Sequence, residues 1–346
     1  MKPDIFFAIP GDIKQLTGGY AYDRRMKSEL ELLGHKVQLV PLSPTFPHPN
    51  QKALDSANTS FNKIPDGSVV LIDGLALGVL DDVIAKHKYR LQLFALCHHP
   101  LAMEAGLSDQ QVYDLGKSES RALSICEHVI TTSQHTATVL MSDYGVPDRK
   151  LSVARPGTDP VEFALCSGQV PRILCVATLT KRKAHDVLLR ALAKLSHLDW
   201  QLILVGSKSM DPDWFQQLRT YVEQQQLQQR VEFLGPLAQV EGEYQQADLF
   251  VLPSLYEGYG MVFAEALAYG LPIIGCEAGA VPDLVPQSAG ILVPPNDQEA
   301  LRVALEDLLA HPEKRQELQL GAQAAAKQLP SWQNGAQIIS TAISGE

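Results

Sequence analysis

The segment DLFVLPSLYEGYGMVFAEALAYGLPIIGC, residues 248–276, holds one complete strand–helix–strand pattern. Its two ends, DLFVLPS and LPIIGC, are short apolar runs of the kind that form buried parallel strands. Between them, GMVFAEALAYG has the composition of a buried helix, and it ends at Gly270 shortly before Pro272. This order predicts one unit of a parallel α/β sheet.

The same alternation continues on both sides of this segment. It predicts two Rossmann-like domains, each a doubly wound parallel sheet, that face one another across a cleft. The other predicted strands are DIFFAIP, HKVQLVPL, SVVLIDG, LQLFALCHH and HVITTS, then RILCVATLT, WQLILVGS and RVEFLG. The helices predicted in the first half are residues 20–33, after a glycine-containing loop, and 134–143.

The domain boundary is predicted where the alternation stops. The segment RPGTDPVEFALCSGQVP, residues 155–171, is rich in proline and glycine, as interdomain connections are. We therefore expect a first domain over residues 1–160 and a second over residues 161–330. From residue 297 onward the chain reads as helical, and we expect its last helix, residues 331–346, to pack back on the first domain.

Composition restricts the possible functions. Hydrophobic residues make up 45% and charged residues 20%, a profile typical of soluble globular proteins. The net charge of −10 argues against binding nucleic acid by charge alone. No apolar run approaches the ~18 residues that cross a bilayer, so we expect no transmembrane segment, which leaves peripheral membrane contact open. We expect no signal peptide either, because Pro10 and Gly11 interrupt the N-terminal apolar stretch too soon. The five cysteines are scattered without a C-x-x-C pair, which indicates a reducing, cytoplasmic location.

Two glutamates stand out in the opening segment, because Glu257 precedes Glu265 by eight residues. Glu265 lies in the middle of an apolar helix, where a carboxylate needs a strong donor. A neighbouring Lys or Arg, or a pair of ligand hydroxyls, would serve. Taken alone, Glu257 reads as a solvated loop residue and Glu265 as the partner of a buried base. Taken together at a strand end, they favour a ligand site.

The glycines beside Glu257 indicate what that ligand carries. Gly258 and Gly260 let backbone amides approach a ligand closely, and the first amides of the following helix, those of residues 260–262, form a site for phosphate. A carboxylate would repel phosphate, so Glu257 is expected to face neutral hydroxyls. Eight helical residues rise about 12 Å, too far for a glycosidase pair that flanks one bond. We expect the glutamates to bind opposite ends of a ligand made of sugar, diphosphate and ribose.

On these residues the chain resembles the retaining nucleotide-sugar glycosyltransferases of family 4, which have the GT-B fold. The family's E-x7-E signature matches Glu257 and Glu265, and the resemblance covers nearly the whole chain. TGGY (residues 17–20) resembles the family's glycine loop, CHHP (97–100) its donor-sugar histidine segment, and VATLTKRKAHDVLLRAL (176–192) its basic phosphate clamp. The chain departs from the family at Ala177-Thr178, which is often Gly-Arg, and at Ala184, which is often Gly.

The resemblance implies a role for each matching residue. Glu257 would hold hydroxyls of the transferred sugar and His98 would contact that sugar, with His99 as second choice. Arg182 and Lys183 would stabilise the leaving diphosphate. The implied catalytic residues are Glu257, His98, Arg182 and Lys183, and the implied donor-binding residues are Gly18, Gly19, Gly260, Met261, Val262 and Glu265, of which Glu265 would hold the ribose.

The implied activity moves a sugar from a UDP- or GDP-sugar to an unidentified hydroxyl acceptor, with retention of anomeric configuration. The first domain would bind the acceptor and the second the donor. No metal or other cofactor is expected, because Arg182, Lys183 and the helix start would stabilise the diphosphate and no DxD-like pair of carboxylates stands out in a loop. Asp81 and Asp82 are adjacent but sit at an ordinary helix start. A nucleotide-sugar epimerase of the same fold and a non-catalytic nucleotide-sugar-binding protein remain alternatives. An NAD oxidoreductase is disfavoured because no G-x-G-x-x-G follows the first strand.

Overall fold

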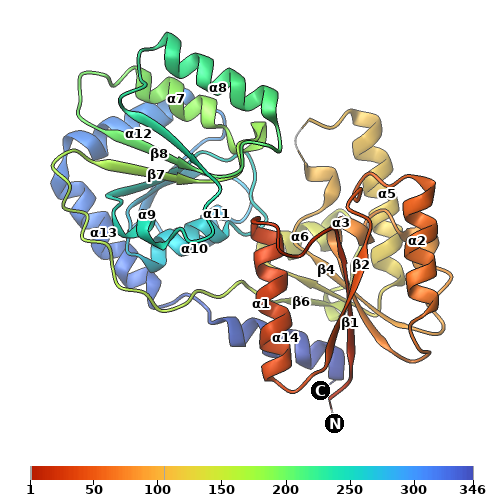
Figure 1. Ribbon diagram of the computed structural model, residues 1–346. Coiled ribbons are helices and arrows are strands. Elements are labelled where there is room, and N and C mark those ends of the chain that lie inside the picture. The colour runs from red at the N-terminus through yellow and green to blue at the C-terminus, as the bar shows by residue number, and fades with distance from the viewer. Residues whose placement is uncertain (1, 105, 346) are drawn as a thin grey trace. The chain divides into compact units, whose positions relative to one another are not determined.

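The computed structural model describes residues 2–104 and 106–345. This part of the chain divides into two compact units (Figure 1), each with its own sheet and hydrophobic core. The first unit contains residues up to 157 and those from 330 onward, and the second contains residues 158–329. The predicted fold class is confirmed, because both sheets are six-stranded, parallel and flanked by helices.

The sheet of the first unit has the strand order β2-β1-β3-β4-β5-β6, and every neighbouring pair is parallel. Strand β3 shows why these segments form strands: its five residues, VVLID, are all buried, as expected for a strand covered on both faces. The order reverses between β1 and β3, which defines a topological switch point. The strands are β1 (Ile5–Pro10), β2 (Val37–Leu42), β3 (Val69–Asp73), β4 (Gln92–Cys97), β5 (His128–Thr131) and β6 (Leu151–Val153).

Helices lie on both sides of this sheet. The last helix, α14, packs against α1, although the two helices lie near opposite ends of the sequence (Figure 1). Gly335 of α14 lies close to α1, because a side chain there would come within 3.6 Å of the Met26 sulfur. Beyond the end of α1, His35 Nε2 lies 2.8 Å from Ser340 Oγ of α14. The helices are α1 (Gly18–Leu32), α2 (Gln51–Asn62), α3 (Gly74–Leu77), α4 (Asp81–Ile84), α5 (Asp109–Ile125), α6 (Gln134–Ser142) and α14 (Trp332–Ser344), with 3₁₀ turns η1 (Leu101–Met103) and η2 (Asp148–Lys150).

The second unit has the strand order β9-β8-β7-β10-β11-β12, again entirely parallel. Its switch point lies between β7 and β10, where the strand order reverses. The strands are β7 (Arg172–Val176), β8 (Gln201–Val205), β9 (Val231–Gly235), β10 (Leu249–Leu252), β11 (Ile273–Cys276) and β12 (Gly290–Val293). The helices are η3 (Lys181–Lys183), α7 (His185–Ala193), α8 (Pro212–Gln224), α9 (Glu241–Gln245), α10 (Met261–Ala268), α11 (Val281–Leu284), α12 (Gln298–Ala310) and α13 (Pro312–Ala326).

Two details differ from the sequence prediction. Helix α1 begins at Gly18 rather than at Tyr20, so Gly18 and Gly19 belong to its first turn and not to a loop before it. Helix α10 ends at Ala268, two residues before Gly270. None of the helices in the described ranges is both long and apolar enough to span a membrane.

Candidate functional site

The switch point of the second unit brings together two loops that lie far apart in sequence. The loop after β7 contains η3, and the loop after β10 leads into α10. Because β7 and β10 are neighbours, both loops leave the same edge of the sheet. A backbone hydrogen bond joins them, in which the Leu255 amide donates to the Arg182 carbonyl at 2.8 Å. This is the edge where open α/β sheets bind their ligands.

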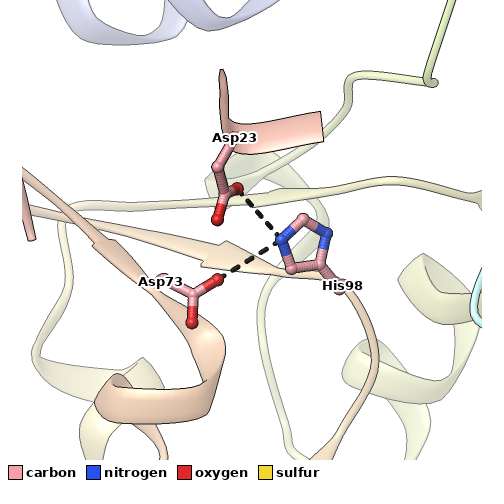
Figure 2. Close-up of side chains that lie close together, drawn as sticks. All are labelled: Asp23, Asp73 and His98. Atoms are coloured by element: carbon pink, nitrogen blue, oxygen red, sulfur yellow. Dashed lines mark hydrogen bonds and ion pairs between the residues drawn. The ribbon is translucent and has the colours of Figure 1, made fainter. Parts of the chain in front are cut away.

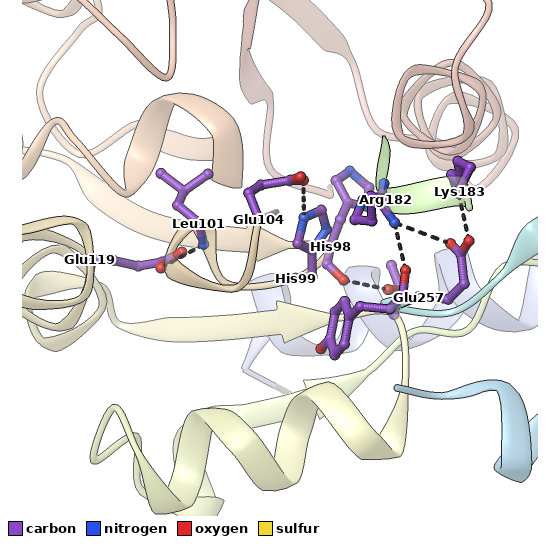
Figure 3. Close-up of polar contacts among 10 residues, drawn as sticks. His98, His99, Leu101, Glu104, Glu119, Arg182, Lys183 and Glu257 are labelled. Atoms are coloured by element: carbon purple, nitrogen blue, oxygen red, sulfur yellow. Dashed lines mark hydrogen bonds and ion pairs between the residues drawn. The ribbon is translucent and has the colours of Figure 1, made fainter. Parts of the chain in front are cut away.

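One carboxylate and two bases meet at this edge, as Figure 3 shows. Lys183 Nζ donates to Glu257 Oε1 at 2.5 Å, and Arg182 Nη1 lies 3.7 Å from Glu257 Oε2. Arg182 also donates to the carbonyl oxygen of Tyr256 at 2.6 Å. The structure therefore brings together three of the four predicted catalytic residues. It also corrects one alternative, because Glu257 is not solvated: it is buried, with 6% of its surface exposed.

The charge of Glu257 is set by its neighbours. Burial alone would raise the pKa of this carboxyl, but the charges of Lys183 and Arg182 outweigh burial and lower it. Glu257 is therefore a buried carboxylate with bound cations. The charges of these two bases would oppose any repulsion between Glu257 and a nearby phosphate.

Glycines fix the backbone around this cluster. Gly260, the residue before α10, has φ +87°, and a side chain there would come within 2.8 Å of the Phe263 ring. Gly279 has φ +60° and lies so close to Glu257 that a side chain would collide with its carbonyl. The Ala280 amide donates to that same carbonyl at 2.9 Å. Both glycines are required by geometry, and Gly279 was not singled out from the sequence.

Met261 and Val262 form the first turn of α10 and are partly exposed. The first amides of an α-helix have no acceptor within the helix, and the helix dipole adds partial positive charge there. These amides follow directly on the Glu257 loop. The start of α10 therefore has the character of an anion site.

Glu265 has a different partner from the base considered from its sequence. The Tyr244 hydroxyl, from α9, donates to Glu265 Oε2 at 2.7 Å. Tyr244 is buried and its ring stacks on that of Tyr269, with centroids 5.1 Å apart. Burial raises the pKa of the Glu265 carboxyl, the Tyr244 hydrogen bond opposes this shift, and Glu241 adds to it.

The first unit contains a second cluster of charged side chains, around His98. His98 follows β4, and its Nε2 lies 3.1 Å from Asp23 Oδ1 and 3.3 Å from Asp73 Oδ2. Figure 2 shows both carboxylates directed at this single nitrogen, Asp23 from α1 and Asp73 from the end of β3. Tyr22 presents its ring edge-on to the imidazole, with centroids 5.3 Å apart. A side chain at Gly19 would contact the ring within 3.6 Å, so this first-turn glycine borders His98.

The two carboxylates raise the proton affinity of His98. Burial would lower the pKa of the imidazole, but Asp23 and Asp73 raise it to about 10. Burial and the nearby Asp73 charge in turn raise the pKa of Asp23 to about 7. The two carboxylates therefore favour the protonated form of the His98 ring.

His99 lies in a separate environment. Its Nε2 is 2.6 Å from Oε1 of Glu104, whose side chain is 36% exposed (Figure 3). Asp81 and Asp82 begin α4 as predicted, and both pair with Arg121 at 2.9 Å.

One group in the described ranges has the composition of a metal site. Among residues 2–104 and 106–345, only Asp23, Asp73 and His98 bring three candidate ligand atoms within 4.8 Å of one another. The same three atoms also satisfy one another as hydrogen-bond donor and acceptors when the ring is protonated.

Sequence reasoning missed Asp23, Asp73 and Tyr244. Asp73 could have been found, because it ends the apolar strand SVVLIDG at the edge where ligands bind. Asp23 shares the apolar face of α1 with Met26 and Leu30, which marks it as a buried carboxylate. Tyr244 left no comparable signal.

Comparisons with known proteins match a family model to the second unit and solved structures of one fold to both units. The profile described as "Glycosyl transferases group 1" matches residues 165–325. The putative colanic acid biosynthesis glycosyltransferase WcaL of Salmonella typhimurium is 30% identical over 184 residues, which are 48% of this chain and 44% of that protein. The amylovoran biosynthesis glycosyltransferase AmsK of Erwinia amylovora is 31% identical over 46% of this chain and 42% of that protein. The match thus spans less than half the length of these two relatives.

Solved structures extend the likeness to both units. Sucrose-phosphate synthase from Thermosynechococcus elongatus superposes with a TM-score of 0.84 at 21% identity, covering 98% of each chain. HepE from Anabaena, solved in complex with UDP and glucose, gives 0.79 at 19% identity and covers 99% of this chain and 100% of that one. At these identities the likeness is one of fold.

Proposed function

We propose that this chain, whose residues 165–325 match the group 1 glycosyltransferases, is a member of that family and transfers a hexose from a UDP- or GDP-sugar to an acceptor hydroxyl with retention of configuration. The observation that carries the proposal is the cluster of Arg182, Lys183 and Glu257 at the switch point of the matched region. A diphosphate is bound by cations and by backbone amides, and the hydroxyls of a sugar are bound by a hydrogen-bond acceptor. This cluster, with the start of α10 beside it, supplies all three.

The leaving diphosphate is the first group to place. In the proposed reaction, Arg182, Lys183 and the amides of residues 260–262 stabilise the negative charge that develops as the glycosidic bond to phosphate breaks. Preorganised donors of this kind act strongly where charge develops. Because they supply this stabilisation, we propose that transfer requires no metal ion.

Glu257 is proposed to accept hydrogen bonds from hydroxyls of the transferred sugar. Its two bases allow a carboxylate to remain charged beside a bound phosphate. Lys183 holds Oε1, whereas Arg182 approaches Oε2 only to 3.7 Å, which leaves Oε2 the more open to a sugar hydroxyl.

Glu265 is proposed to bind the ribose. Tyr244 donates to its Oε2, and Oε1 is then available to accept from a ribose hydroxyl. The HepE structure in complex with UDP supports a nucleotide in a protein of this fold.

In the first unit, His98 is proposed to contact the transferred sugar, and Gly18 and Gly19 are proposed to approach the phosphates. We further propose that this unit binds the acceptor and that the leaving phosphate takes the acceptor's proton. No protein nucleophile is assigned.

A two-stage experiment tests the proposal. Thermal shifts with UDP, GDP, ADP and TDP identify the base, and the matching glucose and mannose donors are then assayed with a panel of hydroxyl acceptors in excess EDTA. We expect one diphosphate to raise the melting temperature and a product whose anomeric configuration, read by NMR, equals that of the donor. Epimerised donor without glycoside would indicate an epimerase, and binding without turnover would indicate a binding protein. Activity lost in EDTA and restored by Mg²⁺ or Mn²⁺ would contradict metal independence.

A further inference from the structure

Three elements of the first unit place their side chains around one ring nitrogen. Asp23 comes from α1, Asp73 ends β3, and His98 follows β4, the strand beside β3. Asp73 is held from its far side, because its Oδ1 accepts from the Leu75 amide at 2.9 Å and so caps α3. Its other oxygen, Oδ2, is the one directed at His98 Nε2. The imidazole is thus oriented by two carboxylates, of which Asp73 is itself held in place by the backbone.

The chemistry of this arrangement determines where the ring protons lie. A carboxylate accepts hydrogen bonds and donates none, so a nitrogen that faces two of them must carry hydrogen. The second ring nitrogen, Nδ1, takes part in neither contact. In the imidazolium, both nitrogens are donors, so Nδ1–H is the group that His98 has left to offer. The side chain keeps 18% of its surface exposed.

We propose that Asp23 and Asp73 are positioning residues that hold His98 as an imidazolium and direct its Nδ1–H to an oxygen of the bound substrate. The inference rests on the proposed function, which has His98 contact the transferred sugar. It adds the protonation state, the atom that makes the contact and the two residues that set both. A charge-assisted donor of this kind is stronger than a neutral imidazole and accepts no hydrogen bond, so it selects an oxygen acceptor.

The titratable groups around His98 favour the same state. Its pKa of about 10 keeps the ring protonated through the neutral range. Asp23, with a pKa of about 7, retains a share of a proton beside Asp73. On the same helix, Tyr20 has a pKa raised to about 12, and Tyr22 is raised as well, so neither carries negative charge near neutral pH. Asp23 Oδ2 is buried and has no hydrogen-bond partner, so the charge of this carboxylate is stabilised only through Oδ1 and its contact with His98.

The direct test is an NMR titration of histidine side chains in the full chain, labelled with ¹⁵N histidine. His98→Gln identifies the His98 signals among the ten histidines. We expect wild-type His98 to stay doubly protonated to at least pH 9. Asp73→Asn and Asp23→Asn should each lower its pKa by more than one unit, because the amide cannot stabilise the cation as a carboxylate does. In Asp73→Asn the side-chain oxygen is retained to cap α3, which protects the fold.

Enzyme kinetics supply a second readout that a merely structural role would not move. The alkaline limb of kcat/KM should lie near pH 9–10 in the wild type and move to lower pH in Asp73→Asn, while the two enzymes approach one another near pH 6. Glu104→Gln is the matched control, because it alters the neighbouring His99 pair and should leave the limb in place. Circular dichroism at pH 6 verifies folding of each variant.

The outcomes separate this inference from the proposed function. A wild-type His98 that titrates near pH 6.5, or variants with unchanged pKa, would overturn the inference whatever the enzyme does. So would Mn²⁺ that selectively broadens the His98 signals, because a cation would then occupy the place of the ring proton. If no transferase activity is found at all, the proposed function fails, and the NMR titration still decides the state of His98.

Discussion

The second unit places one carboxylate between two bases, whereas the first unit places one base between two carboxylates. Glu257 meets Lys183 and Arg182, and the ionised cluster carries a formal charge of +1. His98 meets Asp23 and Asp73, and that ionised cluster carries −1. In both, burial opposes the charge of the central group and the two neighbours outweigh burial. The charge of a buried group therefore depends on how many opposite charges reach it. The net charge of +1 suits the Glu257 cluster to an anionic ligand, whereas the net charge of −1 suits the His98 cluster to holding a protonated ring.

The largest expected effect comes from removing one base of the positive cluster. Lys183→Met should lower kcat by about 10²–10³-fold, the loss measured when one preorganised donor to a developing negative charge is removed. Nucleotide affinity should fall as well, because the cluster then loses its surplus positive charge. Steady-state kinetics and calorimetry with the nucleoside diphosphate measure both quantities.

Lys181 provides the matched control for that substitution. It lies on the same 3₁₀ turn but is exposed, with its ammonium 6.0 Å from the centre of the Trp214 ring. Lys181→Met should keep both kcat and affinity close to wild type. If it lowers kcat as much as Lys183→Met does, the general charge of the turn matters and the specific contact with Glu257 does not.

The central carboxylate of the same cluster should have the next largest effect. Glu257→Gln should reduce kcat/KM by about 10- to 150-fold, which corresponds to losing a charged hydrogen bond of ~1.5–3 kcal/mol in the transition state. Affinity for the free diphosphate should stay equal or become tighter, since Lys183 and Arg182 are no longer countered. Weaker diphosphate binding in this variant would place Glu257 on the phosphate side and contradict its proposed contact with the sugar.

Glu265 offers a smaller effect with the opposite pattern. Glu265→Gln should weaken diphosphate binding by about tenfold, equivalent to ~1.4 kcal/mol, while kcat at saturating donor changes little. The glutamine keeps an oxygen for the Tyr244 hydroxyl, so circular dichroism should report an intact fold. Unchanged diphosphate affinity, measured by calorimetry, would remove Glu265 from the ribose site.

The sequence predicted most of the fold, because the strands and helices follow from local patterns. It predicted only part of the candidate site, because the side chains of the site meet through the tertiary fold. Apolar strands and amphipathic helices alternate along the chain, and that local pattern is enough to predict two parallel sheets. Helix boundaries depend on local detail. Helix α1 begins two residues before the predicted start, with Gly18 and Gly19 in its first turn. Ala184 lies in the left-handed region with φ +50°, a conformation that glycine adopts more easily.

Partners that join through the tertiary fold could not be read from local pattern. Glu257 and Lys183 are 74 residues apart in sequence and meet only because β7 and β10 are neighbours. His98 and Asp23 are 75 residues apart, and their contact joins α1 to the residue that follows β4. The carboxyl end of each strand was a correct place to look, but which side chains meet there depends on strand order.

The smallest expected effect is the change with pH in the contribution of each cluster to folding stability. The pKa of Glu257 is lowered in the folded state, so its stabilising contribution is present above the ordinary carboxyl range and is lost as the pH falls through that range. The pKa of His98 is raised to about 10 from an ordinary value of ~6.5, so its contribution is full below pH 6.5 and is lost as the pH rises toward 10. Acid should therefore weaken the Glu257 cluster, and alkali should weaken the His98 cluster.

Paired variants isolate these two contributions from every other titrating group. Between pH 7 and 10, the melting temperature of wild type should fall more steeply than that of His98→Gln; between pH 5 and 3, it should fall more steeply than that of Glu257→Gln. Each difference should amount to a few degrees, since ~1 kcal/mol shifts the melting temperature of a domain of this size by about 2–4 °C. Calorimetry across both ranges measures them. If the melting temperatures of His98→Gln and wild type fall in parallel above pH 7, Asp23 and Asp73 do not hold the ring proton. The two clusters would then not have opposite responses to pH.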